Sequence, residues 1–339
     1  MADELRLGTR GSQLALWQAN TVAARIETAG GPPCRLIVIK TSGDRLQDAP
    51  LSEVGGKRLF VKEIEDGLLR GEIDLAVHSS KDMPAVLPDG LVVAGVLPRE
   101  DPRDAVVLPV GLKAETTDDG VVSGFSRTVT TIDDLVAALG QGPSIGTSSV
   151  RRIAQLTRLF PGARFTPIRG NLDTRLRKLD EGGHDALVLA AAGLHRLGFA
   201  NRISFALPPA ACVPAPGQGI VAVECRADDE RVREIASRID DRAAGVALEG
   251  ERALVEALGG GCQTPVGALV TALEGDRIEL VAAVIALDGS KAIRAQGTGP
   301  RHDAAALGRT VARDLLSQGA DELLADARRV QGAVEGIQP

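Results

Sequence analysis

The sequence is poor in aromatic residues, with one Trp, six Phe and no Tyr among 339 residues. Proteins that bind single-stranded nucleic acids stack bases on such rings, and a formal net charge of -6 is unlike a basic nucleic-acid footprint. No stretch approaches the ~20 uninterrupted apolar residues of a membrane helix, and the first residues lack the basic and apolar regions of a secretion signal. These absences predict a cytoplasmic protein with no nucleic-acid or membrane partner.

The sequence also lacks the common metal and nucleotide motifs. Its four cysteines include no Cys-x-x-Cys pair and have no His nearby at ligand spacing, which argues against structural zinc and a disulfide framework. Neither Gly-x-x-x-x-Gly-Lys-Ser/Thr nor Gly-x-Gly-x-x-Gly occurs, and the four histidines show no triad spacing. We therefore expect reduced thiols, no metal, no bound nucleotide and no histidine-based hydrolysis.

Apolar periodicity predicts two successive α/β units in the first 200 residues, in a chain long enough for two or three domains. The first unit has expected strands at 5–8, 35–40 and 73–77 and expected helices at 13–27 and 59–69. The second has expected strands at 144–146 and 186–189 and expected helices at 150–160 and 172–179. A polar stretch at 111–131 between the units is expected to be a long surface loop.

Residues 207–219 are rich in Pro and Gly, which suits a crossing between domains. A strand at 220–225 then rejoins the first unit in one interpretation. Farther on, 278–287 and 291–296 flank Asp288-Gly289-Ser290, a hairpin signal, and a helix follows. We expect domain 1 at 1–98 and 219–238, domain 2 at 103–212, and a small α+β domain 3 at 241–333.

Arginines gather at three junctions between an expected strand and the helix after it. The junctions are Thr9-Arg10-Gly11-Ser12, Thr147-Ser148-Ser149-Val150-Arg151-Arg152 and Arg169-Gly170-Asn171-Leu172-Asp173-Thr174-Arg175. Cations at helix N-termini are disfavoured by ~0.3–1 kcal/mol unless an anion lies between them. Because strand carboxyl ends carry the ligands of α/β lobes, this pattern predicts a cleft for a polyanion, either carboxylate or phosphate.

Lys81 and Asp82 follow the expected strand at 73–77, so they also emerge on the ligand edge. A carboxylate beside a polyanion cleft is useful when the ligand offers N–H groups or develops positive charge in the transition state. Gly55-Gly56-Lys57-Arg58 precedes another expected helix and is interpreted either as a mobile flap or as an ordinary surface loop. Cys262 closes the run Gly259-Gly260-Gly261, where a thiol is accessible enough to carry a covalent group.

These motifs together resemble the porphobilinogen deaminase (hydroxymethylbilane synthase) family. The matching segments follow the family's order along nearly the whole chain: 9–19, 54–57, 78–82, 99–104, 146–152, 169–171, 216–219 and 260–263. The resemblance implies a monomer of two α/β lobes similar to periplasmic binding proteins and a small C-terminal α+β domain. It also implies a dipyrromethane cofactor joined by a thioether to Cys262.

The resemblance further implies a transferase of tetrapyrrole (heme, porphyrin) biosynthesis. It is expected to join four porphobilinogen molecules head to tail with release of ammonia, and then to hydrolyse the chain from the cofactor as hydroxymethylbilane. Asp82 is the implied catalytic residue. The implied cofactor-binding residues are Cys262, Lys81, Asp82, Ser12, Thr147, Ser148, Ser149, Arg151, Arg152, Gly170 and Arg175. The implied substrate-binding residues are Arg10, Lys57, Lys62, Arg169, Arg175, Arg196 and Gln218.

Three features depart from the family pattern: Arg58 replaces a flap glycine, Ser80 stands where Met is common, and the 111–131 loop is longer than usual. A two-lobed binding protein or sensor for small carboxylates is the main alternative function. Such a protein needs neither Cys262 nor Asp82, and for that reason it ranks below the enzyme. A pseudoenzyme that retains the fold and cofactor is a second alternative, which only an activity measurement excludes.

Overall fold

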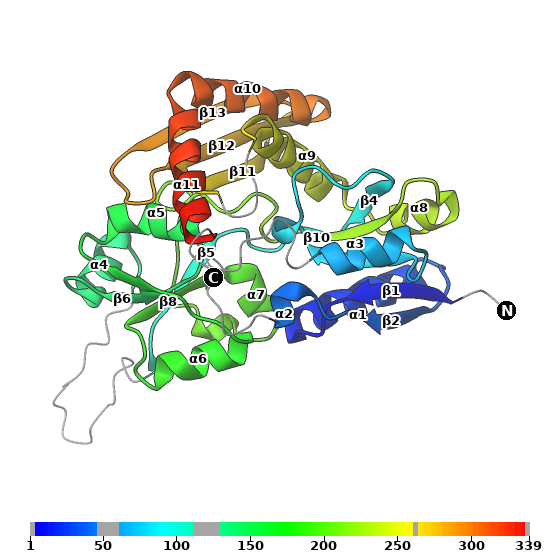
Figure 1. Ribbon diagram of the computed structural model, residues 1–339, viewed down its shortest axis with the longest axis horizontal. Coiled ribbons are helices and arrows are strands. Elements are labelled where there is room, and N and C mark those ends of the chain that lie inside the picture. Colours follow the sequence, from blue (N-terminus) through cyan, green and yellow to red (C-terminus); the bar gives the residue numbers. More distant parts are fainter. Residues whose placement is uncertain (1–3, 46–60, 111–128, 260–263, 336–339) are drawn as a thin grey trace.

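The computed structural model describes residues 4–45, 61–110, 129–259 and 264–335. Within these segments the chain builds three sheets, each packed with helices of its own (Figure 1). This arrangement confirms the expected fold class, which is two α/β lobes and a smaller α+β domain. None of the helices in the described segments combines the length and apolar character of a membrane span.

The first lobe contains a five-stranded sheet in the order β2-β1-β3-β10-β4. β1 is parallel to β2 and β3, whereas β10 is antiparallel to β3 and β4. The strand after the crossing therefore rejoins the first unit, as one interpretation of the sequence predicted. The elements of this lobe are β1 (Leu5–Thr9), α1 (Gln13–Thr28), β2 (Cys34–Val38), α2 (Ser42–Arg45), α3 (Lys62–Leu69), β3 (Leu75–Ser79), the 3-10 turn η1 (Ser80–Asp82), β4 (Leu91–Val96), β10 (Val221–Arg226) and α8 (Glu230–Ser237).

The second lobe repeats this plan with the sheet order β7-β6-β8-β5-β9. β6 is parallel to β7 and β8, and β5 enters antiparallel between β8 and β9. Its elements are β5 (Asp104–Val107), α4 (Ile132–Leu139), β6 (Ser144–Gly146), α5 (Val150–Leu159), β7 (Arg164–Thr166), α6 (Leu172–Asp180), β8 (Ala186–Ala190), α7 (Ala191–Arg196), η3 (Ala200–Arg202) and β9 (Phe205–Ala206).

The third domain is an antiparallel sheet, β11-β12-β13, packed against three helices. The predicted hairpin is the pair β12 and β13. Its elements are α9 (Arg242–Ala257), β11 (Val266–Leu273), β12 (Arg277–Ile285), β13 (Ala292–Pro300), η4 (Arg301–Asp303), α10 (Ala304–Ser317) and α11 (Ala320–Glu335). One apolar core runs without interruption from this domain into the first lobe, where Met83, Val96 and Ile220 belong to it.

Short polar side chains fix where the site-bearing helices begin. Ser12 caps α1 by accepting a hydrogen bond from the backbone N–H of Ala15 at 3.3 Å. Of the two serines predicted as alternatives for α5, Ser149 is the cap and accepts from the N–H of Arg152 at 3.4 Å. Most of the predicted 111–131 loop lies outside the described residues.

Candidate active site

The carboxyl end of β3 carries Lys81 and Asp82 on the turn η1. The chain crosses between the lobes twice, first at 97–103 and again at 207–220. A hydrogen bond from the N–H of Ser80 to the carbonyl of Ile220, at 3.0 Å, ties this turn to the second crossing. Asp82 lines a cavity of about 70 Å³ together with Arg10, Ser12 and Gln18. The predicted ligand edge of the first lobe is therefore a real depression with one carboxylate in it.

The guanidinium of Arg10 binds a carboxylate of the protein itself. Its Nε lies 3.1 Å from Oδ1 of Asp44, and its Nη2 lies 2.5 Å from the same oxygen. Asp44 is held in turn by the hydroxyl of Thr41, which donates to its Oδ2 at 2.8 Å. Arg10 thus lines the cavity while it is paired with Asp44. The position of Arg10 before a helix did not indicate that its partner is a carboxylate of the protein.

Asp104, the first residue of β5, is the centre of a buried ionic cluster. Its side chain is fully buried, and its Oδ2 accepts from Nη1 of Arg151 at 2.7 Å, while its Oδ1 accepts from Nε of Arg152 at 2.9 Å. Burial raises the pKa of Asp104, but the two guanidinium groups outweigh it and hold that pKa well below its usual range. Asp104 is therefore ionised and neutralises part of the local positive charge.

Gln218, from the second crossing, joins this cluster to Lys81. Its side-chain amide donates to Oδ1 of Asp104 at 2.9 Å and to the carbonyl of Pro102 at 2.7 Å. Its side-chain oxygen accepts from Nζ of Lys81 at 3.3 Å. Burial, followed by repulsion from Arg152, lowers the pKa of Lys81 to about 8. One hydrogen-bonded series thus runs from the first lobe through the crossing into the second lobe.

The third arginine junction adds further positive charge. Nε of Arg175 donates to the carbonyl of Gly170 at 2.9 Å. Burial, with repulsion from Arg152 and Arg169, lowers the pKa of Arg175 to about 10. Burial also lowers the pKa of Arg169. Gly170 has φ +109°, and a Cβ there would lie 3.0 Å from Thr174, so this turn requires glycine. Arg152 thus lies close enough to Lys81 and to Arg175 to lower the pKa of each.

The polar residues before α5 are used partly within the loop. The side chain of Thr147 is buried and accepts from the N–H of Ser149 at 3.3 Å. The hydroxyl of Ser148 donates to the carbonyl of Ile168 at 3.3 Å. These bonds fix the turn between β6 and α5, which directly precedes Arg151 and Arg152. A hydroxyl group in this turn can still accept a hydrogen bond from a ligand, or rotate to donate one.

Arg196, at the end of α7, contacts both lobes and the crossing. Its Nη2 donates to the carbonyl of Gly219 at 2.7 Å, and its guanidinium carbon lies 5.5 Å from the centre of the Trp17 ring. Burial lowers the pKa of Arg196. Arg196 therefore lies where the two lobes meet, and its partners Gly219 and Trp17 could not be predicted from the sequence because they are distant along the chain.

Two residues without an assigned role in the sequence, Arg99 and Glu251, connect the third domain to the crossings. Glu251 in α9 is fully buried and accepts from Nη1 of Arg99 at 2.6 Å and from the N–H of Gly217 at 2.6 Å. Nε of Arg99 donates to the carbonyl of Gln218 at 2.9 Å. The sequence analysis assigned no site role to Asp104, Arg99 or Glu251, because a single charged residue produces no periodic pattern. Arg99 and Asp104 do stand in the segment 99–104, which matches the family.

Four of the residues singled out in the sequence lie at or beyond the edge of the described segments. Cys262 and Lys57 lie outside them, as does Arg58. Lys62 is described, and it is exposed at the first position of α3. Within the described segments, no group of three or more His, Cys, Asp or Glu side chains could hold a metal ion.

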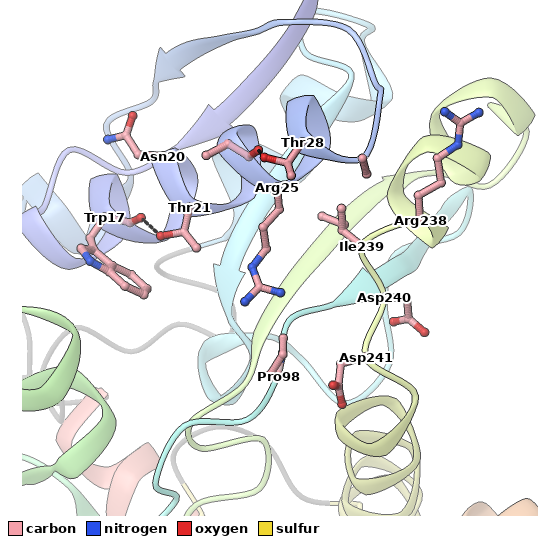
Figure 2. Close-up of a pocket in the computed structure, with 12 residues that line it drawn as sticks. Trp17, Asn20, Thr21, Arg25, Thr28, Pro98, Arg238, Ile239, Asp240 and Asp241 are labelled. Atoms are coloured by element: carbon pink, nitrogen blue, oxygen red, sulfur yellow. Dashed lines mark hydrogen bonds between the residues drawn. The ribbon is translucent and has the colours of Figure 1, made fainter.

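A larger hollow of about 760 Å³ lies elsewhere on the first lobe, between α1 and the segment joining α8 to α9. Figure 2 shows Arg25 extending from α1 toward Pro98, with Asp240 and Asp241 on the other wall. Its lining includes none of the predicted site residues. We therefore assign the site to the smaller cavity, which Asp82, Arg10 and Ser12 line.

The fold and the site define a two-lobed α/β protein with a small cavity that Asp82 lines, a group of lysine and arginine side chains near the crossings between the lobes, and an attached α+β domain. A sequence model described as "Porphobilinogen deaminase, dipyromethane cofactor binding domain" matches residues 5–234, and one described as "Porphobilinogen deaminase, C-terminal domain" matches residues 246–317. The chain belongs to the porphobilinogen deaminase family.

Curated relatives agree in length as well as in sequence. A porphobilinogen deaminase of Syntrophobacter fumaroxidans is 43% identical over 326 residues, which cover 96% of this chain and 98% of that protein. One of Geobacter sulfurreducens is 44% identical over 325 residues, covering 96% and 95%. Among solved structures, a TRAP periplasmic solute binding protein of Desulfovibrio salexigens overlaps at a TM-score of 0.41 with 12% identity, covering 100% of this chain and 98% of that one. We base the fold class on the strand order and not on this overlap.

Proposed function

We propose that the chain is a transferase that joins four porphobilinogen molecules head to tail, releases one ammonia at each addition, and finally hydrolyses the product, hydroxymethylbilane, from a cofactor. The cofactor is a dipyrromethane linked through Cys262. One observation carries the assignment of the site. Lys81 is the neighbour of Asp82 on η1, and Arg152 lies close enough to lower the pKa values of both Lys81 and Arg175, so positive charge from three different elements gathers on the Lys81 side of Asp82.

The residues of the cleft fit a ligand that carries several carboxylates. Each pyrrole of such a ligand bears an acetate and a propionate, and arginine forks bind carboxylates through paired hydrogen bonds. The pKa of Arg175 is about 10 and that of Lys81 about 8, and both are lowered by burial and by neighbouring cations. An anion placed among these groups relieves the repulsion, so the site favours the charge pattern of a dipyrromethane and of a growing pyrrole chain.

The roles of individual residues follow from their partners. When bound, the dipyrromethane supplies the pyrrole α-carbon to which the first substrate is joined. We assign carboxylate binding to Lys81, Arg152, Arg169 and Arg175, with Ser12, Thr147, Ser148 and Ser149 as neutral donors, and with Arg10, Arg196, Gln218, Lys57 and Lys62 on the substrate side. Gly170 contributes its turn and its carbonyl.

Asp82 has the central role in this proposal. Loss of ammonia from porphobilinogen leaves positive charge on the substrate, and a fixed carboxylate stabilises that charge as it develops. Its oxygens also accept hydrogen bonds from pyrrole N–H groups, which orients the substrate toward the carbon that it joins. The 70 Å³ cavity at Asp82 holds one small reacting group, so the remainder of the chain lies between the lobes.

Arg151 acts differently from its neighbours in this account. Its Nη1 is used by Asp104 at 2.7 Å and by the carbonyl of Val213 at 2.7 Å. We therefore propose that Arg151 positions Asp104 and, through it, Arg152 and Gln218. The proposal also retains a cytoplasmic monomer without a nucleic-acid partner, divided at the boundaries expected from the sequence. Light scattering during size-exclusion chromatography tests the monomer.

The experiment that tests the function is the intact mass of the denatured protein beside those of two cysteine variants. The expected result is an added mass of two linked pyrrole units in the wild type and in Cys34→Ser, and its loss in Cys262→Ser. Cys34 is a suitable control because it is a free, half-exposed cysteine remote in sequence from the third domain. A wild-type chain that stays unmodified after incubation with porphobilinogen would favour the carboxylate-binding alternative.

A further inference from the structure

The end of α9 is held by an arginine from the last helix of the chain. Nη2 of Arg328, in α11, donates to the carbonyl of Gly259 at 2.8 Å and lies 3.5 Å from the carbonyl of Leu258. Leu258 is the C-cap of α9, and Gly259 follows it with φ +60°. Arg328 is thus joined to Leu258 and Gly259, which lie 70 and 69 positions before it in the sequence.

The location of this contact is physically meaningful. The last carbonyls of a helix have no partner within the helix, and they form the negative end of its dipole. A guanidinium placed there satisfies these acceptors and is attracted by the dipole. Leu254 of α9, its C-cap Leu258, and Leu323 and Leu324 of α11 all belong to the one apolar core of this domain. Arg328 therefore adds a polar link between two helices that contribute to the same core.

Gly259 stands three residues before Cys262 in the sequence. The direction in which the chain leaves α9 depends on the backbone angles of Leu258 and Gly259. A left-handed glycine has wide conformational freedom, so a bond to its carbonyl restricts this exit. We propose that Arg328 is a positioning residue for the cysteine that carries the cofactor. It acts on the exit from α9 and not on any ligand, and this inference rests on the proposed function.

A matched control is available on the same helix. Arg329 is the next residue, and it pairs with Asp326 within α11 on the exposed surface. Arg328→Gln and Arg329→Gln remove the same charge from adjacent positions, but only the first removes the bond to Gly259. The test uses full-length apo-protein, prepared from cells that make no porphobilinogen, and follows its mass after porphobilinogen is added.

The expected result is that Arg328→Gln gains the two-pyrrole mass about fivefold more slowly than the wild type, in line with the net loss of one ordinary hydrogen bond at an exposed site, while Arg329→Gln loads normally. Arg328→Lys should recover part of the rate because it keeps a donor and the charge. After limiting porphobilinogen, Arg328→Gln should also accumulate shorter bound chains. Thermal unfolding of each variant is measured beside the loading rates.

Equal loading rates in Arg328→Gln and Arg329→Gln would overturn the inference. So would a lower melting temperature in Arg328→Gln with a normal loading rate in the folded protein, since that pattern describes a purely stabilising residue. Failure of the wild type to gain the mass is a different outcome. It would contradict the proposed function itself.

Discussion

Replacement of Asp104 by Asn tests whether the buried cluster organises the site. Asp104 is fully buried and accepts hydrogen bonds from Arg151 at 2.7 Å, Arg152 at 2.9 Å and Gln218 at 2.9 Å. Asn has nearly the same size, but it is neutral, and its amide group turns two donor hydrogens toward these donors. The change therefore leaves two guanidinium groups without their counter-charge and disturbs their geometry.

The expected cost follows from burial. Removing one partner of a buried ion pair destabilises a protein by ~3–5 kcal/mol, because the remaining charge is left uncompensated. At about 2 °C per kcal/mol for a large domain, the melting temperature should fall by about 6–10 °C. Asp101→Asn is the control, since the partner of Asp101 is the half-exposed Arg103 at 2.7 Å. An exposed pair of that kind contributes ~0–1 kcal/mol.

Thermal unfolding and the rate of porphobilinogen consumption, both measured on Asp104→Asn and Asp101→Asn, test whether Asp104 organises the site. Turnover of Asp104→Asn should fall more than its stability explains, because Lys81 and Arg152 lose their common support. The pKa of Asp104 is held below its ordinary value, so its contribution is present above ~pH 4 and is lost as the pH falls through the folded-state pKa. A melting temperature within about 2 °C of the wild type, with normal turnover, would refute the reasoning.

Three further predictions concern the groups that face the ligand. Asp82→Asn should nearly abolish turnover, by a factor of about 100 or more, without a change in unfolding, because it removes a charge next to the reacting centre and little volume; near-normal turnover would contradict the assigned role. Arg175→Gln should lower the affinity for carboxylates about 10- to 100-fold with little loss of stability, since Nε of Arg175 bonds only a backbone carbonyl, that of Gly170, and the change relieves repulsion; binding titrations with porphobilinogen measure the affinity. Lys81 has a pKa of about 8, below its ordinary value, so carboxylate affinity should decline as the pH rises through 8. The free energy of unfolding should increase over the same range, because the cost of burying the charge of Lys81 disappears. An affinity that is flat from pH 7 to about 9, or the same decline in Lys81→Met, would contradict the assignment of this titration to Lys81.

The parts of the structure predictable from sequence are those with local causes. Apolar periodicity located β1, α1, β2, α3 and β3 of the first lobe and β6, α5, α6 and β8 of the second, although it did not indicate β4, β5, β7 or β9. The caps Ser12 and Ser149 stand at predicted junctions. Boundaries were less exact, because they depend on contacts made at a distance. The predicted strand at 35–40 ends at Val38, and α3 begins at Lys62 within the predicted 59–69 helix.

The partners of the charged residues could not be predicted, because they are distant in sequence. Arg151 lies 47 residues from Asp104, and Arg99 lies 152 residues from Glu251. The rule that cations avoid helix N-termini correctly indicated nearby negative charge at Arg10 and Arg151. It could not distinguish a ligand from a carboxylate of the protein, and in both cases the structure supplies an aspartate, Asp44 or Asp104.

The arginines therefore differ in how much each gains by binding a carboxylate of the ligand. An arginine that already has a carboxylate gains little from a second anion, because its charge is compensated. Burial lowers the pKa of Arg175, and its cationic neighbours lower it further, so a ligand carboxylate gains both the pairing energy and the relief of repulsion. Polyanion binding should therefore be concentrated at Arg175 and Lys81, while Asp104 keeps Arg151 from competing for the same carboxylates.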